Sequence, residues 1–220
     1  MISVIVPTQN SGAVLPRCFD SLIAATVRGL VREVIVADGG SSDDTLSIAD
    51  AAGAHVVKGG KTRSSQLIAG AAIARGDWLL FLHPETVLET GWEMEAESFL
   101  SRVTLERPRA ATFRFAIDEF GGSARRREAF AAVRFALFGL PHGNQGLLIT
   151  KRLYKKLSGY RAIASLEDAD LARRIGRRRL VMLRSRAVNV LNPAQDGLRS
   201  LVLGVLHLLR FPAGILARLT

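Results

Sequence analysis

Short apolar runs alternate with helical patterns along the first half of the chain. Compact, mainly apolar runs predict strands at residues 3–6, 33–37, 55–57 and 78–82. Between them, apolar residues recur at helical spacing over residues 13–28, 43–52 and 64–74. Runs that are apolar throughout are typical of strands buried on both faces. The alternation therefore predicts βαβ units and an α/β fold, with a mostly parallel central sheet flanked by helices.

The second half of the chain is less regular. We expect helices near residues 91–103, 124–138 and 165–176, and strands near 110–117 and 147–150. No linker is visible, so we expect one domain over residues 1–220. A C-terminal amphipathic segment at about 197–219 has polar residues on one side of a helical wheel and leucine and valine on the other. This wheel fits either a helix packed in a core or dimer or one lying at a membrane interface.

Polar residues follow several predicted strands. Thr8, Asp38 and Glu85 each lie just beyond an apolar run. Because the carboxyl ends of parallel strands meet at one edge of a sheet, these residues are expected to lie at the same edge, where ligands bind. Asp38 precedes two glycines, so its carboxylate either binds a ribose or base or closes a turn.

Two further groups of residues have chemical and structural interpretations. Glu85 and the nearby His83 offer ligands for Mg²⁺ or Mn²⁺ completed by substrate phosphates, although an exposed loop acid and a strand-capping histidine fit equally. Glu167 and Asp168 begin a predicted helix. Either one of them is a general base, or Asp168 forms a capping box with Ser165.

The charge of the chain predicts anionic partners. Thirty Lys and Arg residues outweigh 20 Asp and Glu, giving a net charge of +10. Much of the excess lies in arginine runs at 125–127 and 173–179, which on helices are usually solvated faces. Lys58, Lys61 and Arg63 precede a predicted helix, where phosphate oxygens bind readily. Aromatic residues make up 6% of the chain, which disfavours nucleic acid as a partner.

Cysteine content and hydropathy bear on the cellular compartment. Cys18 is the only cysteine in the sequence, so it forms no internal disulfide, and its apolar neighbours predict a buried thiol. The sequence shows no signal peptide pattern and no apolar stretch of the roughly 20 residues that a membrane span needs. We therefore expect a cytoplasmic protein, with peripheral contact at the inner face of the membrane left open by the C-terminal wheel.

Five stretches in order resemble the family 2 glycosyltransferases of the GT-A fold. They are VIVPTQN (4–10), VIVADGGSSDDT (34–45), RGDWLLFLHPET (75–86), FGLPHGNQG (138–146) and LEDADL (166–171). Within that family the chain is most similar to a small bacterial subgroup often labelled as arsenosugar-biosynthesis-type glycosyltransferases. The resemblance implies a GT-A, Rossmann-like nucleotide-diphospho-sugar transferase fold.

The resemblance also assigns roles to individual residues. The nucleotide-sugar would be bound by Pro7, Thr8, Asn10, Asp38, Gly39, Arg63, Gln66 and His83. Glu85, with His83, would bind the metal, and the Glu167-Asp168 pair would be catalytic, with Asp168 as the base. The acceptor loop would contain His142, Asn144 and Gln145.

The implied reaction is transfer of a sugar from a UDP- or GDP-sugar donor to a hydroxyl acceptor, with inversion and with Mg²⁺ or Mn²⁺ as cofactor. Lipid-linked and small-molecule acceptors are both open, as is a homodimer. The chain departs from the family pattern at Glu85, which replaces an aspartate, and at Asn144, which replaces an acid. Ile68 stands where an asparagine is common. These departures leave an alternative function, a nucleotide-sugar-binding protein or degenerate transferase.

Overall fold

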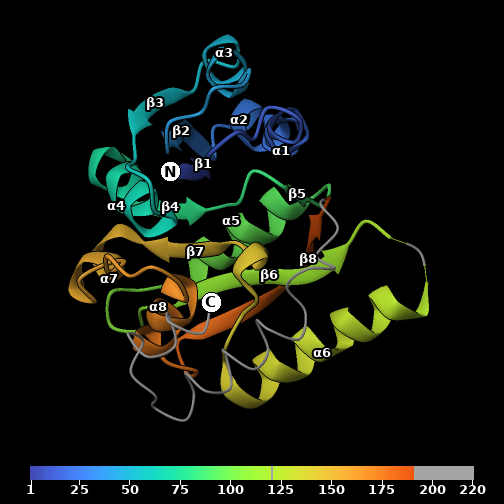
Figure 1. Ribbon diagram of the computed structural model, residues 1–220. Helices are drawn as coiled ribbons and strands as arrows, with labels where there is room; N and C mark the ends of the chain where they lie inside the picture. The colour runs from blue at the N-terminus through green and yellow to red at the C-terminus, as the bar shows by residue number, and fades with distance from the viewer. Residues whose placement is uncertain (120, 191–220) are drawn as a thin grey trace.

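The computed structural model describes residues 1–119 and 121–190 (Figure 1). The predicted amphipathic segment at about 197–219 lies outside the described residues. The strands are β1 (Ile2–Thr8), β2 (Val31–Asp38), β3 (His55–Lys58), β4 (Trp78–Phe81), β5 (Thr86–Leu88), β6 (Ala110–Ile117), β7 (Leu147–Thr150) and β8 (Leu180–Asn189). The helices are α1 (Leu15–Asp20), α2 (Ile23–Val27), α3 (Thr45–Ala51), α4 (Arg63–Ile73), α5 (Trp92–Arg102), α6 (Gly122–Phe138), the 3₁₀ helix η1 (Gly143–Gln145), α7 (Lys151–Lys156) and α8 (Glu167–Ile175).

The described strands form one sheet in the order β3-β2-β1-β4-β7-β6-β8-β5. Strands β3, β2, β1 and β4 are parallel neighbours. Strand β7 runs antiparallel to both β4 and β6, β8 is parallel to β6, and β5 pairs antiparallel with β8. The predicted α/β fold is confirmed, with a parallel half from the first part of the chain and a mixed half from the second.

Helices cover both faces of the sheet, which explains why the strands of the parallel half are apolar throughout. Side chains alternate along β1, so Ile2, Val4 and Val6 join the core that includes α1, α2, α3 and α5. Ile5 joins the opposite core with α4, α7 and α8. A Cβ on Gly70 of α4 would lie 2.5 Å from Ile5 Cγ2, so glycine is required for this close packing of helix on sheet.

Helix α6 packs on the mixed half of the sheet (Figure 1). Ala124 and Ala131 of this helix contact Phe115 and Ile117 of β6 in a small separate core. Among the described residues, none of the helices combines the length and apolarity needed to cross a bilayer.

The first predicted helix is corrected by the structure. Residues 13–28 form two short helices, α1 and α2, separated by a turn at Ser21 and Leu22. The Ser21 hydroxyl donates to the carbonyl of Cys18 at 2.6 Å, and the Leu22 N–H donates to the carbonyl of Phe19. These i to i−3 contacts tighten the chain and end α1. Cys18 is buried, as predicted.

The pattern of apolar residues does not predict β5, α7 or β8. Strand β8 contains Arg184, Ser185 and Arg186, and its register against β6 shifts between Thr112 and Arg114. A shift of this kind breaks the regular alternation on which strand prediction depends.

Glu33 links three segments at the opposite edge of the sheet from the predicted site. Its Oε1 accepts hydrogen bonds from the Ser3 hydroxyl and the Arg75 N–H, both at 2.6 Å. Burial would raise the pKa of Glu33, but these hydrogen bonds lower it below its ordinary value of 4.5. The ionised Glu33 carboxylate therefore stabilises the folded state fully above about pH 4.5. This stabilisation is lost as the pH falls through the lower pKa that Glu33 has in the folded state.

We expect Glu33→Ala to lower the free energy of unfolding by about 1–3 kcal/mol, because Ser3 and Arg75 N–H lose their acceptor. Chemical denaturation at neutral pH measures this change. Glu97→Ala is the matched control: Glu97 forms a surface ion pair with Arg28 and its side chain is 60% exposed, so its loss should stay within about 0.5 kcal/mol. Equal effects of the two variants would contradict the proposed role of Glu33.

Candidate active site

The candidate site lies at the carboxyl edge of the parallel strands. Thr8 and Asp38 are register neighbours at the ends of β1 and β2, and the Thr8 hydroxyl lies 3.1 Å from Asp38 Oδ1. Strand β4 ends beside β1, where the Leu82 N–H donates to the carbonyl of Ile5. His83 and Glu85 follow directly, so the predicted residues of three strands do meet at one edge.

Asp38 closes the turn after β2. Its Oδ2 accepts from the N–H groups of Gly40 and Ser41 at 2.8 and 2.9 Å, and its Oδ1 accepts from the hydroxyls of Thr8 and Ser41. Burial would raise the pKa of Asp38, but these hydrogen bonds lower it. The turn-closing interpretation is therefore correct, and contact with a nucleotide stays a prediction.

We expect Asp38→Ala to weaken nucleotide binding by about tenfold, because the turn that shapes the edge loses its acceptors. Calorimetric titration with UDP and GDP measures the change. Ser41→Ala is the control, since it removes one donor of the turn and leaves the carboxylate in place. A nucleotide affinity equal to that of the wild-type protein in Asp38→Ala would exclude this residue from the binding site.

Arg63 is the centre of a charged cluster at the same edge. Its guanidinium donates to Asp168 Oδ2 at 2.8 Å and contacts His83 Nε2. Its Nε lies 3.0 Å from Glu167 Oε1, at an angle that gives an ion pair without a hydrogen bond. His83 in turn lies 3.2 Å from Glu85 Oε1 and 3.9 Å from Asp168 Oδ2. The cluster thus joins residues more than 100 positions apart in the chain.

The ends of two helices position this cluster. Arg63 is the first residue of α4, whose N-cap is Thr62. Asp168 lies in the first turn of α8, and the N-cap there is Leu166, in the left-handed region at φ 66° and without a side-chain cap. The predicted capping box with Ser165 is wrong, because Asp168 points at Arg63 instead of the backbone of its own helix.

Tyr160 and Gly143 complete the surroundings of Asp168. The buried Tyr160 hydroxyl donates to Asp168 Oδ1 at 2.8 Å. A Cβ on Gly143 would lie 3.2 Å from both Arg63 Nη2 and Asp168 Oδ2, so glycine leaves room beside the two charges. Neither residue is predicted from sequence; a tyrosine in a loop eight residues before an acid is too weak a signal.

The cluster shifts the acidities of its two neighbouring carboxyls in opposite directions. Burial would raise the pKa of Asp168, but Arg63, His83 and Tyr160 hold it well below its usual range. Burial raises the pKa of Glu167, with the charge of Asp168 adding to it and Arg63 opposing it. Asp168 is therefore ionised, and it becomes a stronger base only when its pairing with Arg63 loosens.

His83 and Glu85 form a donor pair suited to a divalent cation. Their Nδ1 and Oε1 atoms lie 3.2 Å apart, and two ligands bound at right angles at about 2.1 Å would lie about 3 Å apart. Burial would raise the pKa of Glu85, but the hydrogen bond and charge of His83 lower it to about 2. Within residues 1–119 and 121–190 no three His, Cys, Asp or Glu side chains are arranged to hold a metal by themselves. With His83 neutral, the pair fits a metal that substrate oxygens would complete.

The remaining predicted nucleotide residues lie near Asp38. Pro7 is buried, and exposed Asn10 accepts the Ser42 N–H at 2.9 Å through its side chain. Gln66 is 4% exposed and packs under Gly39, with its amide donating to the carbonyl of Gly60. No hydrogen bond or ion pair joins Asp38 to the Arg63 cluster in the part of the chain that the structure describes.

The predicted acceptor loop lies beside Asp168. The His142 ring stacks at 4.5 Å on Phe115, and burial, with Arg134, lowers the pKa of His142 to about 4. Asn144 is half-buried and its N–H donates to His142 Nδ1 at 3.4 Å. Gln145 is fully buried and donates to the carbonyl of Phe113 at 2.8 Å. Gln145 therefore holds the loop in place, and its role in an acceptor site stays a prediction.

A small cavity adjoins this loop. Its volume is about 20 Å³, enough for one water molecule, and it is lined by His83, His142, Gly143, Tyr160 and Asp168 together with apolar residues. The polar side chains around Asp168 therefore converge on a space that is closed to a sugar in this conformation. Substrate entry would require Arg63 or the loop at residues 139–146 to move.

Comparison with known proteins finds a family match over the first part of the chain. The sequence model of Glycosyl transferase family 2 matches residues 3–93. A PGL/p-HBAD biosynthesis glycosyltransferase of Mycobacterium tuberculosis is 39% identical over 89 residues, which cover 37% of this chain and 34% of the relative. The chain thus matches about a third of that relative's length. The arsenosugar subgroup stays a prediction.

Solved structures match a larger part of the chain. Glucosyl-3-phosphoglycerate synthase from Mycobacterium tuberculosis, in complex with Mn²⁺, UDP and glucosyl-3-phosphoglycerate, aligns with a TM-score of 0.67 and 23% identity over 96% of this chain and 81% of its own. S. aureus TarS aligns with a TM-score of 0.65 and 16% identity over 93% of this chain and 65% of its own. The chain therefore has the GT-A fold, and its residues 3–93 match the sequence model of Glycosyl transferase family 2.

Proposed function

We propose that this protein is a glycosyltransferase that moves a sugar from a nucleotide-diphosphate donor to a hydroxyl acceptor. The observation that carries the proposal is the cluster of Arg63, His83, Glu85 and Asp168 at the carboxyl edge of a sheet with the GT-A fold. The similar synthase binds Mn²⁺ with UDP or UDP-glucose, which supports a UDP-sugar as donor.

Each residue of the cluster has a distinct task in this proposal. Asp168 accepts the proton of the acceptor hydroxyl, and Tyr160 orients it through the bond to Oδ1. Arg63 donates to the diphosphate of the donor, for which a guanidinium has matching geometry. When the diphosphate draws Arg63 away, the pKa of Asp168 rises toward a value at which it accepts a proton. Transfer in a single step inverts the anomeric carbon.

A divalent metal, Mn²⁺ or Mg²⁺, is part of the proposal. His83 and Glu85 would hold it, and it would stabilise the charge on the departing nucleoside diphosphate. Glu85 is ionised and partly exposed, with 18% of its side chain accessible, so the carboxylate can reach a ligand at the surface.

The test is calorimetry with UDP and GDP, with and without Mn²⁺, followed by assay of donor hydrolysis. We expect Mn²⁺ to tighten binding of one of the two nucleotides, and slow hydrolysis of the matching donor sugar. In Glu85→Ala the effect of Mn²⁺ should disappear, whereas Glu89→Ala, an acid of the following segment, should retain it. Binding that does not depend on metal, with no turnover, would contradict the enzyme proposal.

A nucleotide-sugar-binding protein or degenerate transferase is the second candidate. It is favoured by the low pKa of Asp168, which makes this carboxylate a weak base while Arg63 is paired with it. The replacement of the family's aspartate by Glu85 points the same way, because the longer side chain shifts the metal position. The calorimetric experiment separates the two functions by the presence or absence of donor hydrolysis.

The cellular setting belongs to the proposal as well. A cytoplasmic location fits the single buried thiol, and the acceptor is either lipid-linked or a small molecule. The hypothesis has two further parts: the protein contacts the inner face of the membrane, and it forms a homodimer. Both depend on the segment at about 197–219. We expect no nucleic acid as partner.

A further inference from the structure

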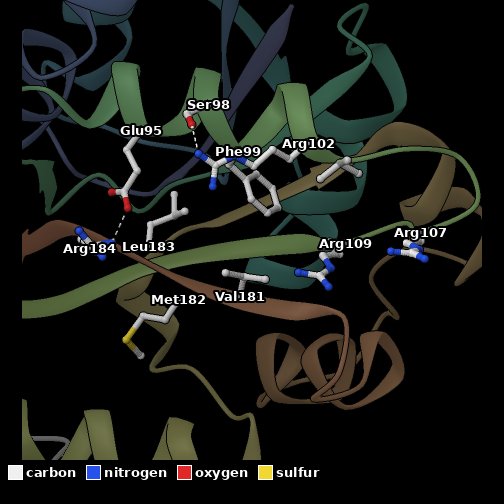
Figure 2. A pocket seen from close by; sticks show the side chains of 11 residues that line it. Glu95, Ser98, Phe99, Arg102, Arg107, Arg109, Val181, Met182, Leu183 and Arg184 are labelled. Atoms are coloured by element: carbon white, nitrogen blue, oxygen red, sulfur yellow. Dashed lines mark hydrogen bonds between the residues drawn. The ribbon is translucent and has the colours of Figure 1, made fainter.

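A second cavity lies at the opposite edge of the sheet from the candidate active site. It has a volume of about 560 Å³, within the range of small-molecule sites. It is formed between α5, the loop before β6 and the first residues of β8, as Figure 2 shows. Strands β6 and β8 are parallel and begin side by side at Ala110 and Leu180. Strands β1, β2 and β4 run in the same direction, and the candidate active site lies at their carboxyl ends. The cavity therefore lies at the opposite ends of the strands.

Four arginines surround this cavity against a single glutamate. Arg102 and Arg184 lie on α5 and β8, and Arg107 and Arg109 lie on the loop before β6 (Figure 2). The carboxylate of Glu95 accepts from the N–H groups of Arg184 and Ser185, both at 2.8 Å. The backbone of β8 thus holds the Glu95 carboxylate in place, and four arginines against this one acid leave the cavity cationic.

The arginines of the loop are available for a ligand. Within residues 1–119 and 121–190 the guanidinium groups of Arg107 and Arg109 have no hydrogen bond or ion pair with an acid, and both residues are exposed. Arg102 has only a neutral partner, donating to the Ser98 hydroxyl at 2.9 Å. The carbonyl of Arg179, in the turn before β8, accepts the Ala110 N–H and so fixes the start of β6 beside the start of β8.

The floor of the cavity is apolar. Phe99 of α5 and Val103, the residue after that helix, face Val181 and Leu183 of β8, and the Phe99 ring packs edge-on against Trp78 at 5.8 Å. An inorganic anion alone would leave this surface exposed to water. A ligand with an apolar part would cover it, and the apolar area that is removed from water would add to the affinity.

We propose that this cavity binds a ligand that carries a phosphomonoester next to an apolar group. A phosphate offers three acceptor oxygens and nearly two negative charges, which match several guanidinium groups better than a single carboxylate does. The arginine-rich rim holds the phosphate, and Phe99, Val181 and Leu183 hold the apolar part. Both a soluble phosphorylated compound and a lipid headgroup have this chemistry.

The test uses the full chain with phenyl phosphate and inorganic phosphate as soluble probes. Phenyl phosphate should bind more tightly than inorganic phosphate, and hydrogen exchange should slow in the segments 98–110 and 180–184. The double variant Arg107→Gln with Arg109→Gln should weaken phenyl phosphate binding by about tenfold or more. Vesicles of phosphatidylcholine with and without phosphatidic acid form the second arm, and binding only to the former identifies a lipid headgroup as the source.

The control variant is Arg32→Gln with Arg126→Gln, which removes the same charge from two exposed arginines that do not line the cavity. It should bind both phenyl phosphate and phosphatidic acid vesicles like the wild-type protein. All the substituted side chains are exposed, and unchanged melting temperatures would confirm that both double variants fold. The proposal is overturned if the two double variants behave alike, if protection appears only at the candidate active site, or if neither probe binds.

Discussion

Replacing Asp168 with asparagine should lower the rate of sugar transfer by about 10²–10⁴-fold, the usual contribution of a general base. The amide keeps the acceptor oxygen for the Tyr160 hydroxyl, and Arg63 keeps its ion pair with Glu167 at 3.0 Å. Nucleotide affinity should therefore stay nearly unchanged. Initial rates with saturating donor, together with a calorimetric titration of the nucleotide, separate the two effects.

Glu167→Gln is the matched control for Asp168→Asn. It removes the adjacent carboxylate, which also pairs with Arg63 but has no hydrogen bond or ion pair with Tyr160 or His83 in the described residues. We expect a loss of roughly tenfold, arising from the altered position of Arg63. Full activity in Asp168→Asn, or a greater loss in Glu167→Gln, would show that the base has been assigned to the wrong residue.

Replacing Arg63 with alanine should lower kcat/KM by about 10²–10³-fold, the cost of losing one preorganised donor to developing charge. The diphosphate would lose its guanidinium, and Glu167 and Asp168 would lose the cation that pairs with both. Because an opposite charge lowers the pKa of a carboxyl, removal of Arg63 should raise the pKa of Asp168. Activity that needs the ionised carboxylate would then begin at a higher pH, so the acid limb of the pH profile should move upward.

Two variants control for this result. Arg63→Lys keeps the charge but loses the planar fork, so its activity should fall between those of the wild type and Arg63→Ala. Lys61→Ala removes an exposed cation from the loop just before α4 and should change kcat/KM little. If Arg63→Ala binds UDP and GDP as tightly as the wild-type protein does, Arg63 does not contact the diphosphate.

The parallel half of the fold is predictable from local pattern because its strands are buried on both faces. Val34, Ile35 and Val36 form a continuous apolar run, and polar Asp38 marks the end of that strand. The second half is harder, since β8 carries Arg184 and Arg186 in a strand with a shifted register. Its place between β6 and β5 depends on pairing with residues 70 to 103 positions away, which no local window contains.

The sequence by itself determined the alternation of strands and helices, the edge at which Thr8, Asp38, His83 and Glu85 lie, and the resemblance to family 2 glycosyltransferases. These features follow from short-range order, because each is encoded within a few neighbouring residues. Only the tertiary structure decided that Asp168 faces Arg63 instead of capping its own helix, that Tyr160 donates to it, and that Gln145 is buried. Such contacts join distant segments, and packing and charge pairing across the whole fold select them over the local alternatives.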